Sequence, residues 1–410
     1  MTMENKKNVP AIRFEGFTGN WRSKRFDKTF SMLCNNTLSR AALNYEKGST
    51  KNVHYGDVLI KFGEYTDVAR EDIPYISDDK IADKYITSRL QDGDIVFADT
   101  AEDATAGKCT ELFNVQQQPI ISGLHTIPCR PLFPFSTGYL GYFLNSPAYH
   151  NQLLPLMQGT KVVGISKTAI RETNVSFPDD TDEQQAIGKC FQNIDRLINT
   201  SQTKLDKLKN IKKACLEKMF PGKGSNTPEL RFKGFKDEWC TKFLEDDEFN
   251  IVAGGDVDKE KLQSTGTYPV LANALVNDGI VGYYHDEYRI TTPAVTVTGR
   301  GDVGYAKARK TNFTPVVRLL TIKSKHDVDY MENAINKHKV IVESTGVPQL
   351  TVPQIKKYEI WFPYNHKEEE QIGSFLLKLD TITDFYKNKI NKLKNIKKAC
   401  LNKMFVTGED

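Results

Sequence analysis

The chain of 410 residues repeats two parts of its own sequence, and this duplication limits its possible folds more than any other feature. The pattern P-x-[IL]-R-F-x-G-F-x-x-x-W begins at Pro10 and again at Pro228. The ten-residue sequence K-L-K-N-I-K-K-A-C-L begins at Lys207 and recurs without a change at Lys392. Because repeated sequence indicates repeated structure, we expect two copies of one plan, each with the same opening and the same closing segment.

The opening pattern and the closing sequence recur at different spacings, so the two copies differ in length between these landmarks. The opening patterns lie 218 positions apart and the closing sequences 185, so the first copy holds 33 more residues between its landmarks. Each copy therefore has a variable middle and a fixed closing segment. We predict six parts, namely a first domain (1–176), a long helix (177–220), a linker (221–227), a second domain (228–361), a second long helix (362–405) and a tail (406–410).

Both closing segments carry apolar residues at alternating spacings of four and three, which is typical of a coiled-coil seam. In each copy a lysine interrupts the seam, at Lys212 or Lys397, and an isoleucine stands one place earlier, at Ile211 or Ile396. This offset predicts a local change in helix winding. The residues predicted to pair the two helices are Ile187, Phe191, Ile194, Ile198, Leu205, Leu208, Ile372, Leu376, Leu379, Ile390 and Leu393.

Chain lengths favour two helices that run in opposite directions. A helix of about 38 residues is about 57 Å long, whereas a linker of about seven residues spans at most about 25 Å. The second domain then begins near the far end of the first helix, and the second helix runs back along the first. We predict an α+β fold, with two mixed α/β domains joined by two long antiparallel coiled-coil helices in a pseudo-twofold internal repeat.

The variable middles predict short strands and contain no catalytic motif. Runs of β-branched and apolar residues at 94–98, 291–298 and 316–322 predict strands. A G-x-G-x-x-G string begins at Gly299, but the residues after it are too broken for the helix that a dinucleotide site requires. The seven histidines and seven cysteines show no ligand spacing, so we predict neither a metal site nor a catalytic residue.

Charge and hydropathy limit where the protein can be located and which partners it can bind. A net charge of +4, from 56 basic and 52 acidic residues, excludes a histone-like basic arm but allows a locally positive groove. The first residues lack the apolar stretch of a signal peptide, and no run of apolar residues is long enough for a membrane span. We expect a cytoplasmic protein.

The twice-used opening pattern, the unlike middles and the twin helices ending K-x-x-[IL]-K-K-A-C-L-x-K-M-F resemble the specificity subunit of type I restriction-modification systems, over nearly the whole chain. The resemblance implies that each middle is a target recognition domain that reads one half of a bipartite double-stranded DNA target. It implies that the helices set the spacing and dock two modification subunits, which methylate adenine at N6. The chain itself would hold no cofactor, because S-adenosylmethionine, ATP and Mg would belong to the modification and restriction subunits.

Basic, acidic and aromatic residues on the expected loops are the candidates for contacting bases and phosphates, and each good base contact supplies about 1–3 kcal/mol of discrimination. Two other functions stay open. One is a two-armed coiled-coil scaffold that does not bind DNA, and the other is a nucleotide-dependent enzyme built on the glycine loop. The predicted DNA-binding residues are Lys61, Glu64, Tyr65, Arg70, Lys108, Arg300, Lys307, Arg309 and Lys310.

Overall fold

The computed structural model describes residues 8–115, 118–222, 224–338 and 348–406. The chain divides into two compact units, unit 1 (Met1–Ser201 with Lys389–Asp410) and unit 2 (Gln202–Asn388). Parts of the predicted first domain, linker, second domain and tail lie outside the described residues. In the described ranges no helix combines the length and the apolar character that a membrane span needs.

Unit 1 is built on a five-stranded sheet in the order β2-β11-β7-β9-β5. Its central strand β7 is buried along its whole length, which explains the continuous apolar run I-V-F-A. A four-stranded sheet has the order β10-β4-β6-β3, and β1 pairs with β13 and β8 with β12. The strands are β1 (Arg22–Arg25), β2 (Phe30–Met32), β3 (Leu43–Asn44), β4 (Lys51–Val53), β5 (Tyr65–Asp67), β6 (Tyr75–Ile76), β7 (Ile95–Ala98), β8 (Thr100–Ala101), β9 (Cys109–Phe113), β10 (Ile120–Ser122), β11 (Thr126–Pro131), β12 (Val163–Gly164) and β13 (Asn174–Phe177).

Short α-helices accompany these strands in the described part of unit 1. Helix α3 is buried on every residue and follows Gly138, whose φ of 88° is a left-handed conformation that glycine adopts at no steric cost. The helices are α1 (Tyr55–Ile60), α2 (Asp79–Ala82), α3 (Tyr139–Leu144), α4 (Pro147–Leu153) and α5 (Lys167–Arg171). The large core of unit 1 joins α3 and the five-stranded sheet to the residues that follow the last long helix.

Unit 2 has a smaller sheet of four antiparallel strands in the order β15-β21-β18-β19, with α7 packed on β19 and β18. A three-stranded sheet has the order β17-β16-β20, and β14 pairs with β22. The elements are β14 (Cys240–Phe243), β15 (Asn250–Ala253), β16 (Tyr268–Leu271), β17 (Ile280–Tyr284), β18 (Ala294–Thr298), β19 (Ala306–Arg309), β20 (Thr314–Pro315), β21 (Leu319–Lys323), α7 (Val328–Lys337), α8 (Val352–Lys356) and β22 (Glu359–Phe362). Strand β19, rather than a helix, follows the glycine string, so the string is the turn of a β-hairpin.

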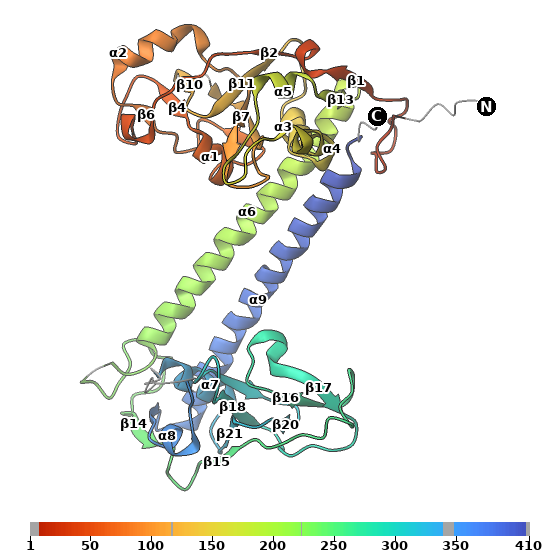
Figure 1. Ribbon diagram of the computed structural model, residues 1–410. Coiled ribbons are helices and arrows are strands. Elements are labelled where there is room, and N and C mark those ends of the chain that lie inside the picture. The colour runs from red at the N-terminus through yellow and green to blue at the C-terminus, as the bar shows by residue number, and fades with distance from the viewer. Residues whose placement is uncertain (1–7, 116–117, 223, 339–347, 407–410) are drawn as a thin grey trace, which may run out of the picture. The chain divides into compact units, whose positions relative to one another are not determined.

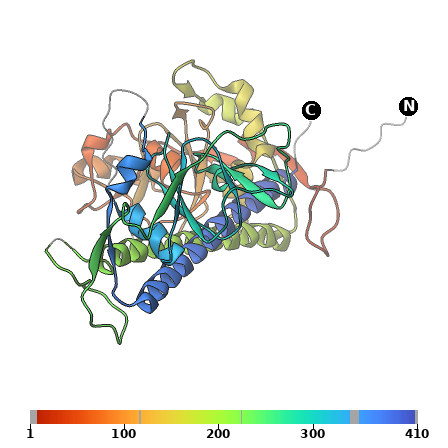
Figure 2. The ribbon, with the colours of Figure 1, turned by 90° about the horizontal axis from the view of Figure 1, so that it is seen from below.

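The two long helices are α6 (Thr181–Lys218) and α9 (His366–Lys403), each an unbroken helix of 38 residues (Figure 1). In unit 2 the last turns of α6 run beside α9 (Figure 1 and Figure 2), and Lys212 Nζ lies 2.6 Å from Asp380 Oδ1. Every residue predicted to pair the helices is buried or half-buried. Ile211 and Ile396 are exposed, whereas Lys212 and Lys397 are half-buried, so the lysines keep the seam positions and the seam does not shift.

The opening pattern of each copy is tied to the start of a long helix. In unit 1 the guanidinium of Arg13 donates to both carboxylate oxygens of Glu183, each at 2.7 Å. In unit 2 Arg231 makes the same bidentate contact with Glu368, at 2.6 and 2.8 Å. Both glutamates are almost fully buried. Because a buried carboxylate needs a paired charge, this contact explains why the opening arginine recurs in both copies.

The same opening pattern also contacts the end of the other long helix. The Ile12 N–H donates to Lys403 O in unit 1, and the Leu230 N–H donates to Lys218 O in unit 2, both at 2.9 Å. In unit 1 the ring of Phe405, just after α9, packs edge-on against Trp21. Each opening pattern therefore supplies a donor to a carbonyl at a helix end, where no intrahelical partner exists.

In unit 2 the corresponding contact joins Phe220, just after α6, to Trp239. These two phenylalanines end the repeated K-M-F sequence, and the two tryptophans end the repeated opening pattern. In the core of each unit, the opening pattern of one copy thus meets the closing sequence of the other copy.

Candidate functional site

Unit 1 places an irregular junction where its central strand ends. Strand β7 ends at Ala98, and the next residue, Asp99, donates its N–H to His125 O at 3.1 Å. The Asp99 carbonyl accepts from the Ile165 N–H at 2.8 Å, and Thr100 pairs with Gly164. The segment that leads toward α6 is thereby held against the end of the central strand.

Unit 2 builds the same junction with different residues. Strand β18 ends at Thr298, and Gly299 O accepts from the Leu350 N–H at 3.0 Å. Arg300 pairs with Gln349 as an isolated bridge. Ile165 and Leu350 are 185 positions apart, as are Gly164 and Gln349, so the closing segments align in structure as they do in sequence.

A left-handed residue precedes the neighbouring strand in both units. His125 stands just before β11 with a φ of 54°, and Arg318 stands just before β21 with a φ of 71°. Both side chains are exposed. Residues other than glycine seldom adopt this conformation, and such strain gathers at functional sites. We name residues 99–101 with His125, and 299–301 with Arg318, the exit junctions.

The two exit junctions present different chemistry on a similar backbone. In unit 1 His125 Nδ1 lies 3.2 Å from Asp99 Oδ1, and the Tyr55 ring meets the His125 ring edge-on. In unit 2 Asn273 accepts from the Gly299 N–H at 2.8 Å and donates to Val317 O at 3.0 Å. The exit junction of unit 1 therefore carries an acid, an imidazole and a neighbouring phenol, whereas the equivalent junction of unit 2 carries two guanidinium groups.

Glycine is required at the exit junction of unit 2. A Cβ atom on Gly299 would lie 2.2 Å from Arg318 O and 2.8 Å from Leu350 O. Backbone atoms cannot move aside for it as a flexible side chain would. The close approach explains the glycine that begins the G-x-G-x-x-G string without any nucleotide.

Two of the residues predicted for DNA binding in the first domain are exposed. The Arg70 side chain is 86% exposed and lies 3.3 Å from the Asp67 carboxylate. Lys61 follows α1, is exposed, and contacts the carbonyl of Asp72. Arg70 therefore has the freedom to reach another molecule, whereas Asp72 and the Tyr45 ring hold the Lys61 side chain in place.

The other three predicted residues of the first domain make internal contacts. Lys108 Nζ donates to Leu59 O at 2.8 Å and Phe62 O at 3.1 Å, and burial lowers the pKa of Lys108. Glu64 Oε2 lies 2.8 Å from Lys397 Nζ. The Tyr65 ring stacks on Phe113 with centroids 4.0 Å apart, and burial raises the pKa of Tyr65. These contacts position α1, α9 and β5 within unit 1.

Only Arg300, among the predicted residues of the second domain, lies at an exit junction, and its side chain makes no ion pair with any described residue. Arg309 donates to Thr296 Oγ1 at 2.9 Å and to Asp278 O at 3.0 Å, and burial lowers the pKa of Arg309. It lines a small cavity of about 30 Å³ together with Lys307.

The last two predicted lysines of the second domain face the helix α7. Lys307 Nζ lies 3.7 Å from Glu332 Oε1. Lys310 Nζ lies 2.7 Å from Asp329 Oδ2, and its side chain is still more than half exposed. The structure therefore brings Lys307, Arg309 and Lys310 together on one hairpin, and the two lysines have acidic partners on α7.

Sequence reasoning missed His125, Asn273 and Arg318. No motif marks these residues, because each depends on which strand lies beside the central one. The predicted strand at 316–322 ran through Arg318, whereas the left-handed turn there delays β21 to Leu319. A histidine or arginine before a strand carries no signal of its own in the sequence.

Comparison with known proteins gives a family for the whole arrangement. The model of the type I restriction modification DNA specificity domain matches residues 52–210 and 236–395. Two curated relatives come from Mycoplasma pneumoniae and are named as type I specificity subunits. S.MpnORF507P is 26% identical over 50% of this chain and 55% of its own length, and S.MpnORF89P is 28% identical over 34% of this chain and 43% of its own. The chain spans about half the length of these curated relatives.

A solved structure shares the fold. The crystal structure of a type I restriction-modification system S subunit from M. genitalium aligns with a TM-score of 0.66, over 97% of this chain and 99% of that one, at 13% identity. The two matched ranges fall in the two copies of the repeat, and each includes most of a variable middle and of the long helix that follows it. The chain therefore belongs to the type I restriction modification DNA specificity family.

Proposed function

We propose that the chain is the specificity subunit of a type I restriction-modification complex and has no catalysis of its own. In this proposal the domains 1–176 and 228–361 are target recognition domains, and each reads one half of a bipartite double-stranded DNA target. The observation that carries the proposal is the match of the DNA specificity model to both halves of the chain. Two unlike middles on one repeated plan suit a target with two unlike halves.

We assign DNA reading to the exit junctions first. They occupy the same place in both units but differ in side chains, which is what two different half-sites require. Arg300 and Arg318 can pair with guanine edges or phosphates, whereas Asp99 and His125 can pair with cytosine or adenine edges. Lys61, Arg70 and Lys310 remain exposed candidates for phosphate contacts, since phosphate neutralisation supplies much of the affinity for DNA.

The long segments 177–220 and 362–405 would pair as an antiparallel coiled coil with a pseudo-twofold relation. Support comes from contacts inside each unit. In unit 1 Lys397 contacts Asp195 and Phe405 contacts Phe191. Later residues of the second segment therefore contact earlier residues of the first, as in an antiparallel pair. In unit 2 Asp380 meets Lys212 and Tyr386 meets Lys204 in the same sense. Such a coil would fix the spacing between the two half-sites.

Exposed apolar residues on the long helices are the proposed docking sites for two modification subunits. Leu197 and Ile382 are each 43% exposed, and they lie 185 positions apart. Ile211 and Ile396 form a second such pair, at 37% and 41%. Apolar side chains that stay exposed at equivalent places of both copies indicate two equivalent partner contacts. The adenine-N6 methyltransferase chemistry would belong to those partners.

The cofactors of the complex would also be held outside this chain. Modification subunits would bind S-adenosylmethionine, and restriction subunits would supply ATP- and Mg-dependent translocation and cleavage. The complex would act in the cytoplasm, where it meets chromosomal and incoming DNA.

The proposal is tested by exchanging one domain and mapping methylated adenines across the genome. Cells that carry the chain should methylate one bipartite sequence, and cells without it should not. Replacing residues 10–176 by the corresponding domain of another family member should change one half of that sequence and leave the other half and the spacer unaltered. A change in both halves would contradict modular reading, and no sequence-dependent methylation or DNA protection in the assembled complex would favour a scaffold without DNA binding.

A further inference from the structure

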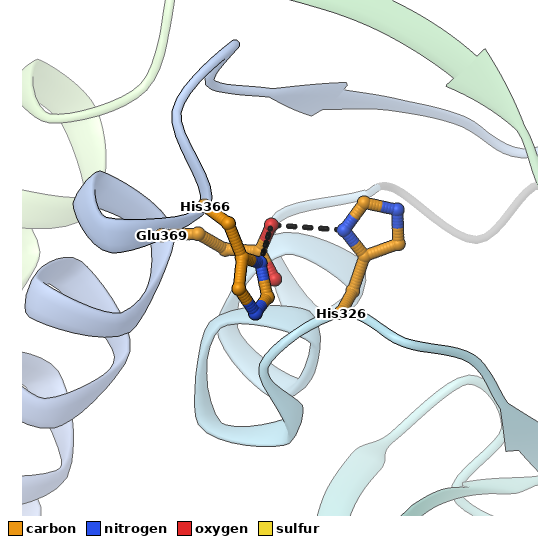
Figure 3. Close-up of side chains that lie close together, drawn as sticks. All are labelled: His326, His366 and Glu369. Atoms are coloured by element: carbon orange, nitrogen blue, oxygen red, sulfur yellow. Dashed lines mark hydrogen bonds and ion pairs between the residues drawn. The ribbon is translucent and has the colours of Figure 1, made fainter.

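Three side chains of types that can ligate a metal converge in unit 2, at the start of α9 (Figure 3). His366 and Glu369 lie one turn apart on α9, and His326 reaches them from the loop before α7. His326 Nδ1 lies 2.8 Å and His366 Nδ1 lies 3.4 Å from the same atom, Glu369 Oε2. One donor atom from each of the three side chains fits within a span of 4.8 Å.

These separations are close to those of a zinc site. Zinc bonds of about 2.0–2.1 Å to nitrogen and oxygen place the donors of a tetrahedron about 3.3 Å apart. The separations of 2.8 and 3.4 Å lie on either side of that value. Two imidazoles and one carboxylate are also a donor set that zinc uses when the fourth position is left for water.

Each histidine has a carboxylate near its other ring nitrogen. Glu248 Oε2 lies 3.4 Å from His326 Nε2, and Glu370 Oε1 lies 3.6 Å from His366 Nε2. Metal-bound histidines usually donate the remaining N–H to such a carboxylate, which fixes the tautomer and the orientation of the ring. Both carboxylates therefore lie beside the rings that they would orient, at distances longer than a usual hydrogen bond, and Lys242 Nζ also lies 3.4 Å from His326 Nε2.

The first copy of the repeat has no metal-ligating side chain at the equivalent positions, so it shows which contacts the fold itself needs there. Glu369 aligns with Gln184, and His366 with Thr181, both at the 185 offset. In unit 1 Gln184 Oε1 accepts from the Ser136 N–H at 3.0 Å. In unit 2 Glu369 Oε1 accepts from the Asp327 N–H. A neutral amide thus makes the same backbone contact as Glu369 Oε1, and the second oxygen of Glu369, which contacts the two histidines, has no such role in the first copy.

The third position shows a similar replacement. Phe135 precedes Ser136 and packs edge-on against Phe177, whereas His326 precedes Asp327 and stacks on Phe362 at 4.0 Å. Phe177 and Phe362 are 185 positions apart. A phenylalanine is therefore sufficient for this packing, and all three positions carry a metal ligand only in the second copy.

We propose that His326, His366 and Glu369 form a Zn²⁺ site that ties the first turn of α9 to the loop before α7. The zinc would take one oxygen of Glu369 and one nitrogen from each ring, with water in the fourth position. Glu248 and Glu370 would accept the remaining ring N–H groups. The site would fix where the second domain joins its long helix, and it does not depend on which DNA sequence the chain reads.

The test is equilibrium dialysis of the full chain against ZnCl₂ in a chloride buffer without chelator, with zinc counted by mass spectrometry. We expect one Zn²⁺ per chain. The variants Glu369→Gln and His326→Phe restore the side chains of the first copy, so they should keep the fold, which circular dichroism would verify. Each should lower zinc affinity at least 100-fold, as should His366→Ala, and Glu248→Gln should lower it about 10–100-fold.

A matched control is His285→Ala, which removes an exposed histidine of unit 2 outside the cluster and should leave zinc binding unchanged. Zinc should also raise the melting temperature of the wild-type chain and leave that of Glu369→Gln unaltered, because only a ligand that prefers the folded state stabilises it. Failure of the wild-type chain to bind zinc, or equal zinc affinity of the wild type and His366→Ala, would overturn the proposal.

Discussion

Lys397 Nζ lies 2.7 Å from Asp195 Oδ1, and this ion pair stands where the apolar seam of the long helices is interrupted. The equivalent ion pair in unit 2 joins Lys212 to Asp380. Lys212 stands 185 positions before Lys397, and Asp380 stands 185 positions after Asp195. A charged pair within an apolar seam costs stability if it is misaligned, so it favours one register over the others. The repeated lysines are therefore seam residues with acidic partners.

Reversing one charge of the seam should destabilise unit 2, and reversing both should restore it. Lys212→Asp places two carboxylates side by side, and we expect a loss of about 1–2 kcal/mol in the free energy of unfolding. The double variant Lys212→Asp with Asp380→Lys should regain most of it. Urea unfolding measures both, and Lys213→Asp, on an exposed neighbour, is the control. If the double variant is less stable than the single one, the pair does not set the register.

The opening arginines should be far more important for stability than nearby surface arginines. Arg231→Ala leaves the carboxylate of Glu368 buried without its bidentate partner, and we expect a loss of about 3–5 kcal/mol. Arg22, whose pair with Asp179 is about half exposed, is the control, and Arg22→Ala should cost about 0–1 kcal/mol. Thermal unfolding of the purified chain compares them. Similar losses for the two variants would argue against a tie between opening pattern and helix.

Stability should fall as pH rises through the range set by Glu111. This carboxyl is fully buried behind α3, and burial raises its pKa from 4.5 to about 7, although the Gly138 and Gly141 N–H groups donate to it. Between these values the folded state holds a proton that the unfolded chain has released. The contribution of Glu111 to the free energy of unfolding should therefore be greatest below about pH 4.5 and should fall by about 2–3 kcal/mol by pH 7.

The measurement for Glu111 is urea unfolding at several pH values for the wild type and Glu111→Gln, which cannot titrate. The stability of the wild type relative to the variant should decline from pH 4.5 to pH 7 and then level off. Glu102→Gln, on an exposed loop, should leave the wild-type profile in place. A wild-type advantage that rises with pH over this range would give the wrong sign and reject the buried proton.

The exit junction of unit 2 should control one half of the recognised DNA sequence. Arg300→Ala and Arg318→Ala should each lower binding of the assembled complex to its target by about 1–3 kcal/mol, or roughly 5- to 150-fold, with relaxed preference at one position of one half-site. His125→Ala should relax the other half-site instead. Lys233→Ala, on the exposed opening pattern, is the control. Competition binding with single-base variants of the target separates these results from uniform weakening.

Substitutions at exposed residues of the long helices should weaken docking of partner subunits, whereas substitutions at seam residues should lower the stability of the fold. Leu208→Lys introduces a charge among partly buried apolar contacts and should cost about 2–5 kcal/mol. Ile211→Lys with Ile396→Lys alters exposed residues, so stability should stay within about 0.5 kcal/mol per site. The exposed pair should nevertheless weaken co-purification of the modification subunits. Normal assembly of that double variant would remove these residues from the docking surface.

The sequence by itself determined the duplication, the two long helices and the family. Helix periodicity is a local property, and seam residues such as Ile187 and Leu376 are buried because neighbours three or four places away select one face of the helix. The alignment of Ile165 with Leu350 also followed from sequence, since a repeat in the chain becomes a repeat in the backbone contacts.

Only the tertiary structure decided which distant residues meet. His326 and Glu369 are 43 positions apart, and Asp99 and His125 are 26, so no spacing rule connects them. The predicted absence of a metal site followed from such spacings, and the cluster at the start of α9 is a property of folded contacts. Likewise Lys108 and Glu64 looked like free charges, but the structure places both against internal partners. Packing between residues far apart in the chain selects these neighbours, and the local sequence pattern contains no information about that packing.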